Sequence, residues 1–125
     1  RGRRIALWGL AFKPGTDDMR EAPSLVLIPQ LLEAGAEVVA YDPVAMDEAR
    51  RRLGSEAIRY AADAYGAVLD ADALVLLTEW KEFRLPNWEV LKRAMRGHAV
   101  VDGRNIFDRA ELRSLGFDYY GIGVL

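Results

Sequence analysis

Short apolar segments alternate with helix-like segments along the whole chain. The apolar segments fall at 3–9, 37–43, 58–60, 72–78, 99–102 and 119–122. Helical spacing of apolar residues, or a polar helix face, occupies the intervals at 22–35, 46–53, 63–69, 88–95 and 109–115. Parallel strands need crossover helices, and these crossovers are right-handed. The alternation therefore predicts an α/β fold, a Rossmann-like doubly wound parallel sheet in a single domain.

Capping and turn residues mark the expected element boundaries. Pro23 suits the first turn of a helix, where its missing N–H costs nothing, and Gly35 suits the helix end. Pro29 inside the same segment predicts a kink. Asp63 is expected to cap the helix at 63–69, and Gly97 to stop the helix at 88–95.

Composition excludes several functional classes. The chain has 125 residues and a formal net charge of -2, which argues against sequence-blind nucleic-acid binding. It has no run of eighteen apolar residues and no signal-peptide pattern, so neither a membrane span nor secretion is expected, and the cytoplasm is the default compartment. Cysteine is absent, which excludes a disulfide, a thiolate metal site and a Cys nucleophile from these residues. The single histidine, His98, is interpreted as a surface residue before a strand, and no metal site is predicted.

Polar residues follow the predicted strands at their carboxyl ends. Lys13 follows the first strand, Asp42 the second, Thr78-Glu79-Trp80 a central one and Arg104 a later one. Parallel strands bring these ends to one edge of the sheet, where open α/β sheets bind ligands. Lys13 is a compact ammonium and Arg104 a planar fork suited to phosphate or a uracil carbonyl. Together they predict an anion site.

The common nucleotide fingerprints are missing. No G-x-G-x-x-G follows the first strand, and no G-x-x-x-x-G-K-[ST] is present, so neither ordinary dinucleotide binding nor a P-loop is supported. Without a glycine fingerprint, Asp42 is only a weak candidate for a ribose-binding acid. From the residues alone, the prediction stops at an anion-binding α/β domain.

Simpler structural interpretations stay open for most of these residues. Lys13 is also consistent with a solvated surface lysine, and Phe12 with a core plug. Asp17 and Asp18 suit the start of a helix, and Arg20 is placed to pair with either. An aromatic cluster under a loop accounts for Trp80, Phe83 and Trp88, and a solvated helix face for residues 50–52.

The segment from Gly9 to Pro23, G-L-A-F-K-P-G-T-D-D-M-R-E-A-P, resembles a signature of the UDP-glucose/GDP-mannose dehydrogenase family, in its C-terminal UDP-binding domain. Later segments resemble further signatures in the family's order: 40–45 (AYDPVA), 71–75 (ADALV), 78–83 (TEWKEF), 102–105 (DGRN) and 119–123 (YYGIG). The resemblance covers essentially the whole chain. Segments 40–44 and 119–123 look more like the bacterial UDP-glucose branch of the family.

The resemblance implies a function for the whole enzyme and a specific role for this domain. Enzymes of the family oxidise the C6 alcohol of a nucleotide sugar to a carboxylate with two NAD, through a covalent intermediate on a Cys, and the bacterial UDP-glucose branch implies oxidation of UDP-glucose to UDP-glucuronate. Residues 1–125 correspond to the UDP-binding domain, without the N-terminal NAD-binding and central domains, so no catalytic residue and no activity are expected of them alone. The family's substrate contacts fall on Phe12, Lys13 and Arg104, and its NAD contact falls on Arg20. UDP-glucose, the other domains and a second subunit in a homodimer are the implied partners.

Three other interpretations compete with this one. Within the family, a GDP-mannose or UDP-N-acetylhexosamine dehydrogenase is the neighbouring alternative. A non-catalytic α/β anion-binding or regulatory module is an alternative of another class. A phosphoacceptor receiver domain is disfavoured, because its lysine comes late in the chain whereas Lys13 follows the first strand.

Overall fold

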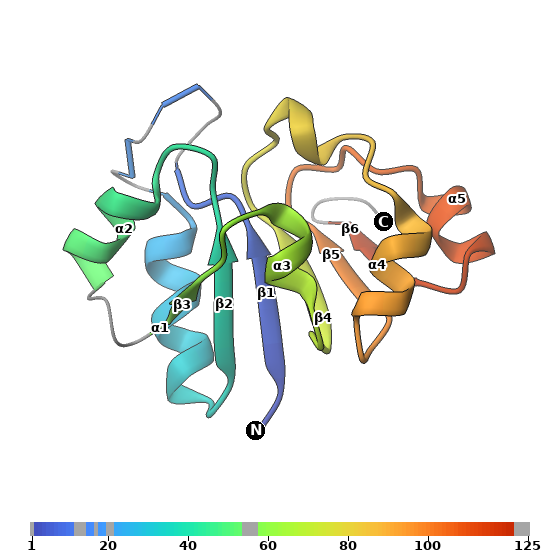
Figure 1. Ribbon diagram of the computed structural model, residues 1–125, viewed down its shortest axis with the longest axis horizontal. Helices are drawn as coiled ribbons and strands as arrows, with labels where there is room; N and C mark the ends of the chain where they lie inside the picture. The colour runs from blue at the N-terminus through green and yellow to red at the C-terminus, as the bar shows by residue number, and fades with distance from the viewer. Residues whose placement is uncertain (1, 12–14, 17, 20–21, 54–57, 122–125) are drawn as a thin grey trace.

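Six parallel strands form a single sheet in the order β3-β2-β1-β4-β5-β6 (Figure 1). The computed structural model describes residues 2–11, 15–16, 18–19, 22–53 and 58–121. The strands are β1 (Arg4–Trp8), β2 (Glu37–Tyr41), β3 (Arg59–Tyr60), β4 (Ala73–Leu76), β5 (Ala99–Asp102) and β6 (Asp118–Gly121). The strand order reverses between β1 and β4, so the carboxyl ends of these two strands form the switch point of a doubly wound fold. This topology confirms the predicted fold class.

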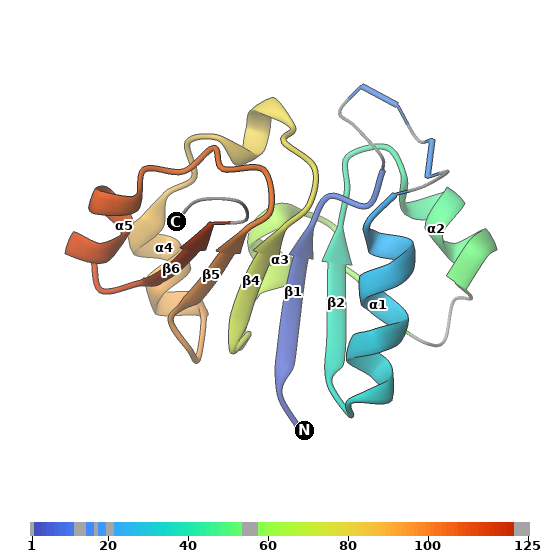
Figure 2. The ribbon, with the colours of Figure 1, turned by 180° about the vertical axis from the view of Figure 1, so that it is seen from behind.

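Two groups of helices cover opposite faces of the sheet. The helices are α1 (Ser24–Glu33), α2 (Met46–Leu53), α3 (Ala64–Val68), α4 (Trp88–Ala94) and α5 (Arg109–Ser114). Helices α1 and α2 pack against β1 and β2 through one apolar core, with Ile28 and Ala49 among its buried members. Helices α3, α4 and α5 pack on the other face through a second core that contains Val68, Leu91 and Leu112. Figures 1 and 2 show the two faces.

Two of the predicted helix ends, at Asp63 and at Gly35, are confirmed. Asp63 accepts a hydrogen bond from the Gly66 N–H at the start of α3. Helix α1 continues through Pro29 to Glu33, and Gly35 follows with a φ of +90°. A left-handed residue at this position is what a helix end requires, and glycine adopts it without steric cost.

Several predicted boundaries are wrong, each for a local reason. Gly97 does not end α4, which stops at Met95 because that backbone is extended. A Cβ on Gly97 would instead overlap the backbone oxygen of Asp72, so a close approach of two segments requires the glycine. Strand β4 ends at Leu76, earlier than predicted, because Leu77 and Thr78 both donate their N–H to the Trp8 carbonyl and the ladder cannot continue.

The aromatic residues form two groups instead of one loop cluster. Phe83 closes a short 3-10 helix, η1 (Lys81–Phe83), that was not predicted, and its ring stacks on Trp8 with centroids 4.9 Å apart. Trp88 meets Phe107 and Phe117 edge-on, with centroids 5.0 and 5.4 Å away. Both groups belong to the core under α3, α4 and α5.

The half of the sheet formed by β4, β5 and β6 is bare on the α1 side. Figure 2 shows no helix over these strands on that face, among the parts of the chain that are described. An apolar groove of about 380 Å³ runs between α1 and the strands β1, β4 and β5, with Leu27, Leu31, Val75, Leu77 and Val101 among its lining residues. A sheet face of this composition is normally covered in a folded protein.

Acid pH is expected to weaken the amino end of the sheet. Hydrogen bonds from Arg96, 2.8–3.0 Å long, and from the Arg4 N–H lower the pKa of Asp72 from its ordinary value of 3.8 to about 2. Because the folded-state pKa is the lower one, the stabilisation is complete above pH 4 and is lost as the pH falls towards 2. Urea unfolding at pH 5 and pH 2 should show about 1–2 kcal/mol less acid destabilisation in Asp72→Asn than in the wild type. Equal acid sensitivity in both proteins would contradict this.

Candidate functional site

A buried carboxylate, Asp42, joins three loops at the carboxyl edge of the sheet. Its Oδ2 accepts hydrogen bonds from the N–H groups of Leu10 and Ala11, at 2.7 and 3.2 Å, and from Nε1 of Trp80 at 3.3 Å. Its Oδ1 accepts from two further N–H groups, those of Val44 and Ala45, both at 2.8 Å. The residue is fully buried. Every contact is a donor to the carboxylate, so Asp42 holds the backbone together and has no oxygen available for a ribose.

Two more buried side chains hold the same stretch of the loop after β1. The Ser24 hydroxyl donates to the carbonyl of Leu10, and the Thr78 hydroxyl donates to the carbonyl of Ala11, both at 2.7 Å. Gly9 has a φ of +97°, and a Cβ there would overlap Thr78. Three of the four buried polar side chains in the described residues thus act on residues 10 and 11. These residues lead directly into Phe12 and Lys13.

The fourth buried polar side chain, Asp102, builds the loop that carries Arg104. Its Oδ1 accepts from the Arg104 N–H at 3.1 Å, and its Oδ2 accepts from the Phe107 N–H and the Tyr119 hydroxyl at 2.8 and 2.9 Å. Burial and the hydrogen bond to Asp102 raise the pKa of Tyr119 to about 12, so the hydroxyl stays protonated and keeps donating. A Cβ on Gly103 would lie 2.6 Å from the Leu76 carbonyl oxygen, which explains the glycine in this loop.

The Arg104 guanidinium is paired with Glu79 across the edge of the sheet. Nε and Nη2 of Arg104 donate to the two carboxylate oxygens of Glu79, at 2.9 and 3.3 Å. Burial raises the pKa of Glu79, but the hydrogen bond from Arg104 and the neighbouring positive charges outweigh it and hold the pKa below its ordinary value. The Arg104 side chain remains 35% exposed, so it is within reach of a ligand from solvent.

A hollow of about 450 Å³ lies beside this ion pair. Its lining residues are Gly15, Glu79, Trp80, Lys81 and Arg84. It therefore borders the loop after β1 on one side and the segment after β4 on the other. Cationic side chains and an indole around one opening are groups that can take a phosphate and an aromatic base.

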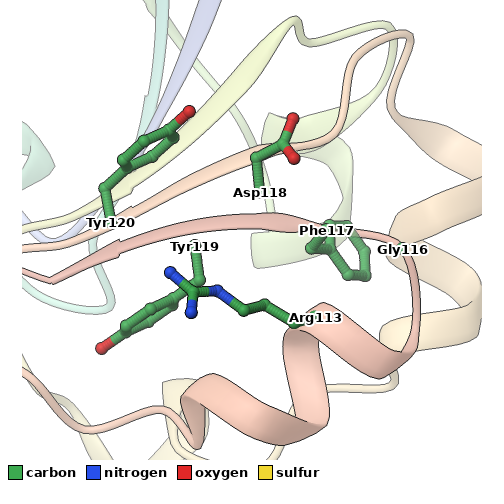
Figure 3. Close-up of a pocket in the computed structure, with 6 residues that line it drawn as sticks. All are labelled: Arg113, Gly116, Phe117, Asp118, Tyr119 and Tyr120. Atoms are coloured by element: carbon green, nitrogen blue, oxygen red, sulfur yellow. The ribbon is translucent and has the colours of Figure 1, made fainter.

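A second hollow, of about 350 Å³, lies at the outer strand β6 and contains no predicted site residue. Figure 3 shows Tyr120 and Asp118 pointing to one side of this strand, and Tyr119 and Arg113 lying on the other. It forms where the last helix turns back to the edge of the sheet at Gly116.

The structure brings together the strand ends that the sequence placed at one edge. Arg104, Asp42 and the Thr78–Trp80 segment meet there as predicted, while Phe12, Lys13, Asp17 and Arg20 lie outside the described residues. Asp18 does not start α1, since the first turn of that helix contains no acid. The roles of Ser24 and Glu79 were not predicted from the sequence. For Glu79, the sequence indicated only that a residue directly after a central strand lies at the carboxyl edge of the sheet.

The described residues contain no cluster of three or more His, Asp or Glu side chains arranged to hold a metal ion. In the same part of the chain, no helix has the length and apolar character needed to span a lipid bilayer.

Residues 6–109 match the model of the UDP-glucose/GDP-mannose dehydrogenase family, UDP binding domain. The UDP-glucose 6-dehydrogenase of Pseudomonas aeruginosa is 52% identical over 128 aligned residues, covering 98% of this chain and 28% of that protein. A solved UDP-glucose dehydrogenase from Pyrobaculum islandicum superposes with a TM-score of 0.78 at 33% identity, over 97% of this chain and 25% of its own.

The NDP-N-acetyl-D-galactosaminuronic acid dehydrogenase of Methanosarcina mazei superposes with a TM-score of 0.82 at 28% identity, over 98% of this chain and 25% of its own. The chain thus spans about a quarter of the length of the relatives it matches. With the match to the family model over most of its residues, the chain belongs to the UDP-glucose/GDP-mannose dehydrogenase family, as its UDP-binding domain.

Proposed function

We propose that residues 1–125 hold the UDP part of UDP-glucose in an NAD-dependent UDP-glucose 6-dehydrogenase. The observation that carries the proposal is a pair of hydrogen-bonded segments at one sheet edge, residues 10 and 11, which directly precede Phe12 and Lys13 in the chain, and the segment that presents Arg104. A lysine and an arginine that both bind a diphosphate offset most of its charge. UDP-glucose is preferred over GDP-mannose and N-acetylated sugars because the curated relatives at 52% and 46% identity are both named UDP-glucose 6-dehydrogenase.

The substrate contacts are assigned to Phe12, Lys13 and Arg104, following the family resemblance. Phe12 offers an apolar surface and Lys13 a point charge next to the anchored residues 10 and 11. Arg104 keeps three N–H bonds that the structure does not engage with described residues, since Glu79 takes only those of Nε and one of Nη2.

NAD binding is assigned mainly to another domain. In a dinucleotide-binding sheet, the pyrophosphate meets free N–H groups in the turn after the first strand. Here the N–H groups of Leu10 and Ala11 are bonded to Asp42, so this part of the turn does not fit a pyrophosphate. Arg20 is assigned as the one cofactor contact from this chain, reaching across the cleft between domains.

The nucleophile of the reaction must also come from elsewhere. Oxidation through a covalent intermediate needs a thiolate, and the chain contains no cysteine. The apolar groove between α1 and the strands β1, β4 and β5 supports a setting in which other domains, or a second subunit of a homodimer, cover this domain.

The test is NADH production from UDP-glucose. The full-length protein should form two NADH for each UDP-glucose, because an alcohol becomes a carboxylate, and the 125-residue chain alone should form none above buffer. In the full-length protein, Arg20→Ala should raise the KM for NAD and leave that for UDP-glucose unchanged. Turnover by the chain alone, or a full-length enzyme that prefers GDP-mannose, would contradict the proposal.

A further inference from the structure

Arg104 reaches the edge of the sheet as one half of a two-point ion pair. Glu79 engages the Nε and Nη2 side of the guanidinium, with both carboxylate oxygens. The Nη1 side makes no hydrogen bond with any described residue. A guanidinium held in this way keeps one flat edge for a ligand while the other edge fixes its orientation.

Both residues of the pair belong to segments that buried side chains hold by hydrogen bonds. Glu79 lies between Thr78, whose hydroxyl is bonded to Ala11, and Trp80, whose indole is bonded to Asp42. The backbone of Arg104 is bonded to the buried Asp102. The Glu79 carboxylate therefore sits at a fixed place in the fold, and Arg104 is the long side chain that it orders.

We propose that Glu79 is a positioning residue for the nucleotide sugar. It holds Arg104 in the rotamer that presents Nη1 to the UDP moiety beside the hollow bounded by Trp80, Lys81 and Arg84. The inference rests on the proposed function, since it concerns the same ligand. The opposite role is a competitor that blocks Arg104 and repels a diphosphate, and it would change affinity in the other direction. The geometry favours positioning, because the pair can persist while Nη1 binds.

The size of the effect follows from the population of the binding-competent rotamer. Without Glu79, an arginine side chain that adopts the required rotamer about one-tenth of the time binds its ligand about tenfold more weakly. Glu79→Ala in the full-length protein should therefore raise the Kd for UDP about tenfold by calorimetry. Glu79→Gln keeps one acceptor oxygen and should raise the Kd for UDP less than Glu79→Ala does. At saturating UDP-glucose, kcat should stay within about twofold of wild type, because no reacting group is removed.

A double-mutant cycle separates positioning from a general structural effect. In an Arg104→Ala background, adding Glu79→Ala should change the Kd by less than about twofold, because Arg104 is the residue through which Glu79 acts. Glu33→Ala removes an exposed carboxylate at the end of α1, at the opposite edge of the sheet, and should leave the Kd unchanged.

Two results would overturn the inference while the proposed function stands. One is a wild-type protein that binds UDP and a Glu79→Ala variant that binds it equally or more tightly. The other is an undiminished penalty for Glu79→Ala in the Arg104→Ala background. A wild-type protein that does not bind UDP would overturn the proposed function itself, and the inference with it.

Discussion

Alanine in place of Arg104 will weaken the binding of UDP-glucose to the full-length protein by a factor of about 30 to several thousand. The range corresponds to the loss of one partner of a desolvated charge pair, about 2–5 kcal/mol. Two groups lose their partner at once, since the ligand loses a donor and the Glu79 carboxylate is left without its guanidinium. Calorimetric titration with UDP-glucose and the KM both report the change.

The fork of the arginine matters as well as its charge. Arg104→Lys keeps one positive charge but cannot engage Glu79 at two points and a ligand at a third, so it should recover only part of the affinity. Lys13→Ala should give a loss of similar size if the family assignment holds for that residue. Arg93→Ala, on the exposed face of α4, is the matched control and should bind like wild type. Normal binding by Arg104→Ala and Lys13→Ala would show that the site lies elsewhere.

Removing the Asp42 carboxylate will lower the free energy of unfolding more than any other polar substitution described above. Asp42→Ala leaves four backbone N–H groups and one indole N–H without their acceptor, and three of these hydrogen bonds, from Leu10, Ala11 and Ala45, are buried. Unsatisfied buried donors cost about 1–3 kcal/mol each, and partial relaxation limits the total. We expect a loss of about 3–5 kcal/mol in the free energy of unfolding, measured by urea denaturation.

A conservative variant tests the same claim. Asp42→Asn keeps the shape but places an amide NH2 against N–H donors, so it should also destabilise the protein by more than about 1 kcal/mol. Asp47→Ala removes a carboxylate whose side chain is 82% exposed and should change stability by less than about 0.5 kcal/mol. If Asp42→Ala were no more destabilising than Asp47→Ala, the role of Asp42 as the junction of the three loops would be wrong.

The periodicity of the sequence was sufficient to predict the fold. The alternation of apolar segments with helical ones predicted the six strands and five α-helices of the described residues, because a doubly wound sheet is the arrangement that right-handed crossovers allow. Boundaries depended on contacts between distant segments. Gly97 is needed beside Asp72 and not as a cap, and β4 ends where two N–H groups converge on Trp8. Neither contact can be predicted from the residues that are next to it in the sequence.

The site was predictable only in part. Parallel strands guaranteed that the residues after each strand would meet, and Arg104 and Asp42 do lie at the same edge. Their roles depended on burial. The position of Asp42 after the second strand resembled that of a ribose-binding acid, but both of its carboxylate oxygens accept hydrogen bonds from backbone N–H groups. In the sequence, Glu79 does not differ from the other acidic residues, and only its ion pair with Arg104 in the structure distinguishes it. The assignments of Phe12, Lys13 and Arg20 stay predictions.

A titration of the 15N-labelled chain with UDP, followed by NMR, tests most directly the central claim that this edge holds UDP. The indole N–H of Trp80 reports on the carboxyl edge of the sheet because it is bonded to Asp42, and the amides of Glu79 and Arg104 report on the ion pair at the same edge. We predict saturable shifts of these signals at UDP concentrations up to about 10 mM, with smaller shifts for GDP and none at Ala73 or Ala99 on the opposite edge. Shifts confined to the opposite edge, or no saturable shift at Trp80, Glu79 and Arg104, would contradict the account.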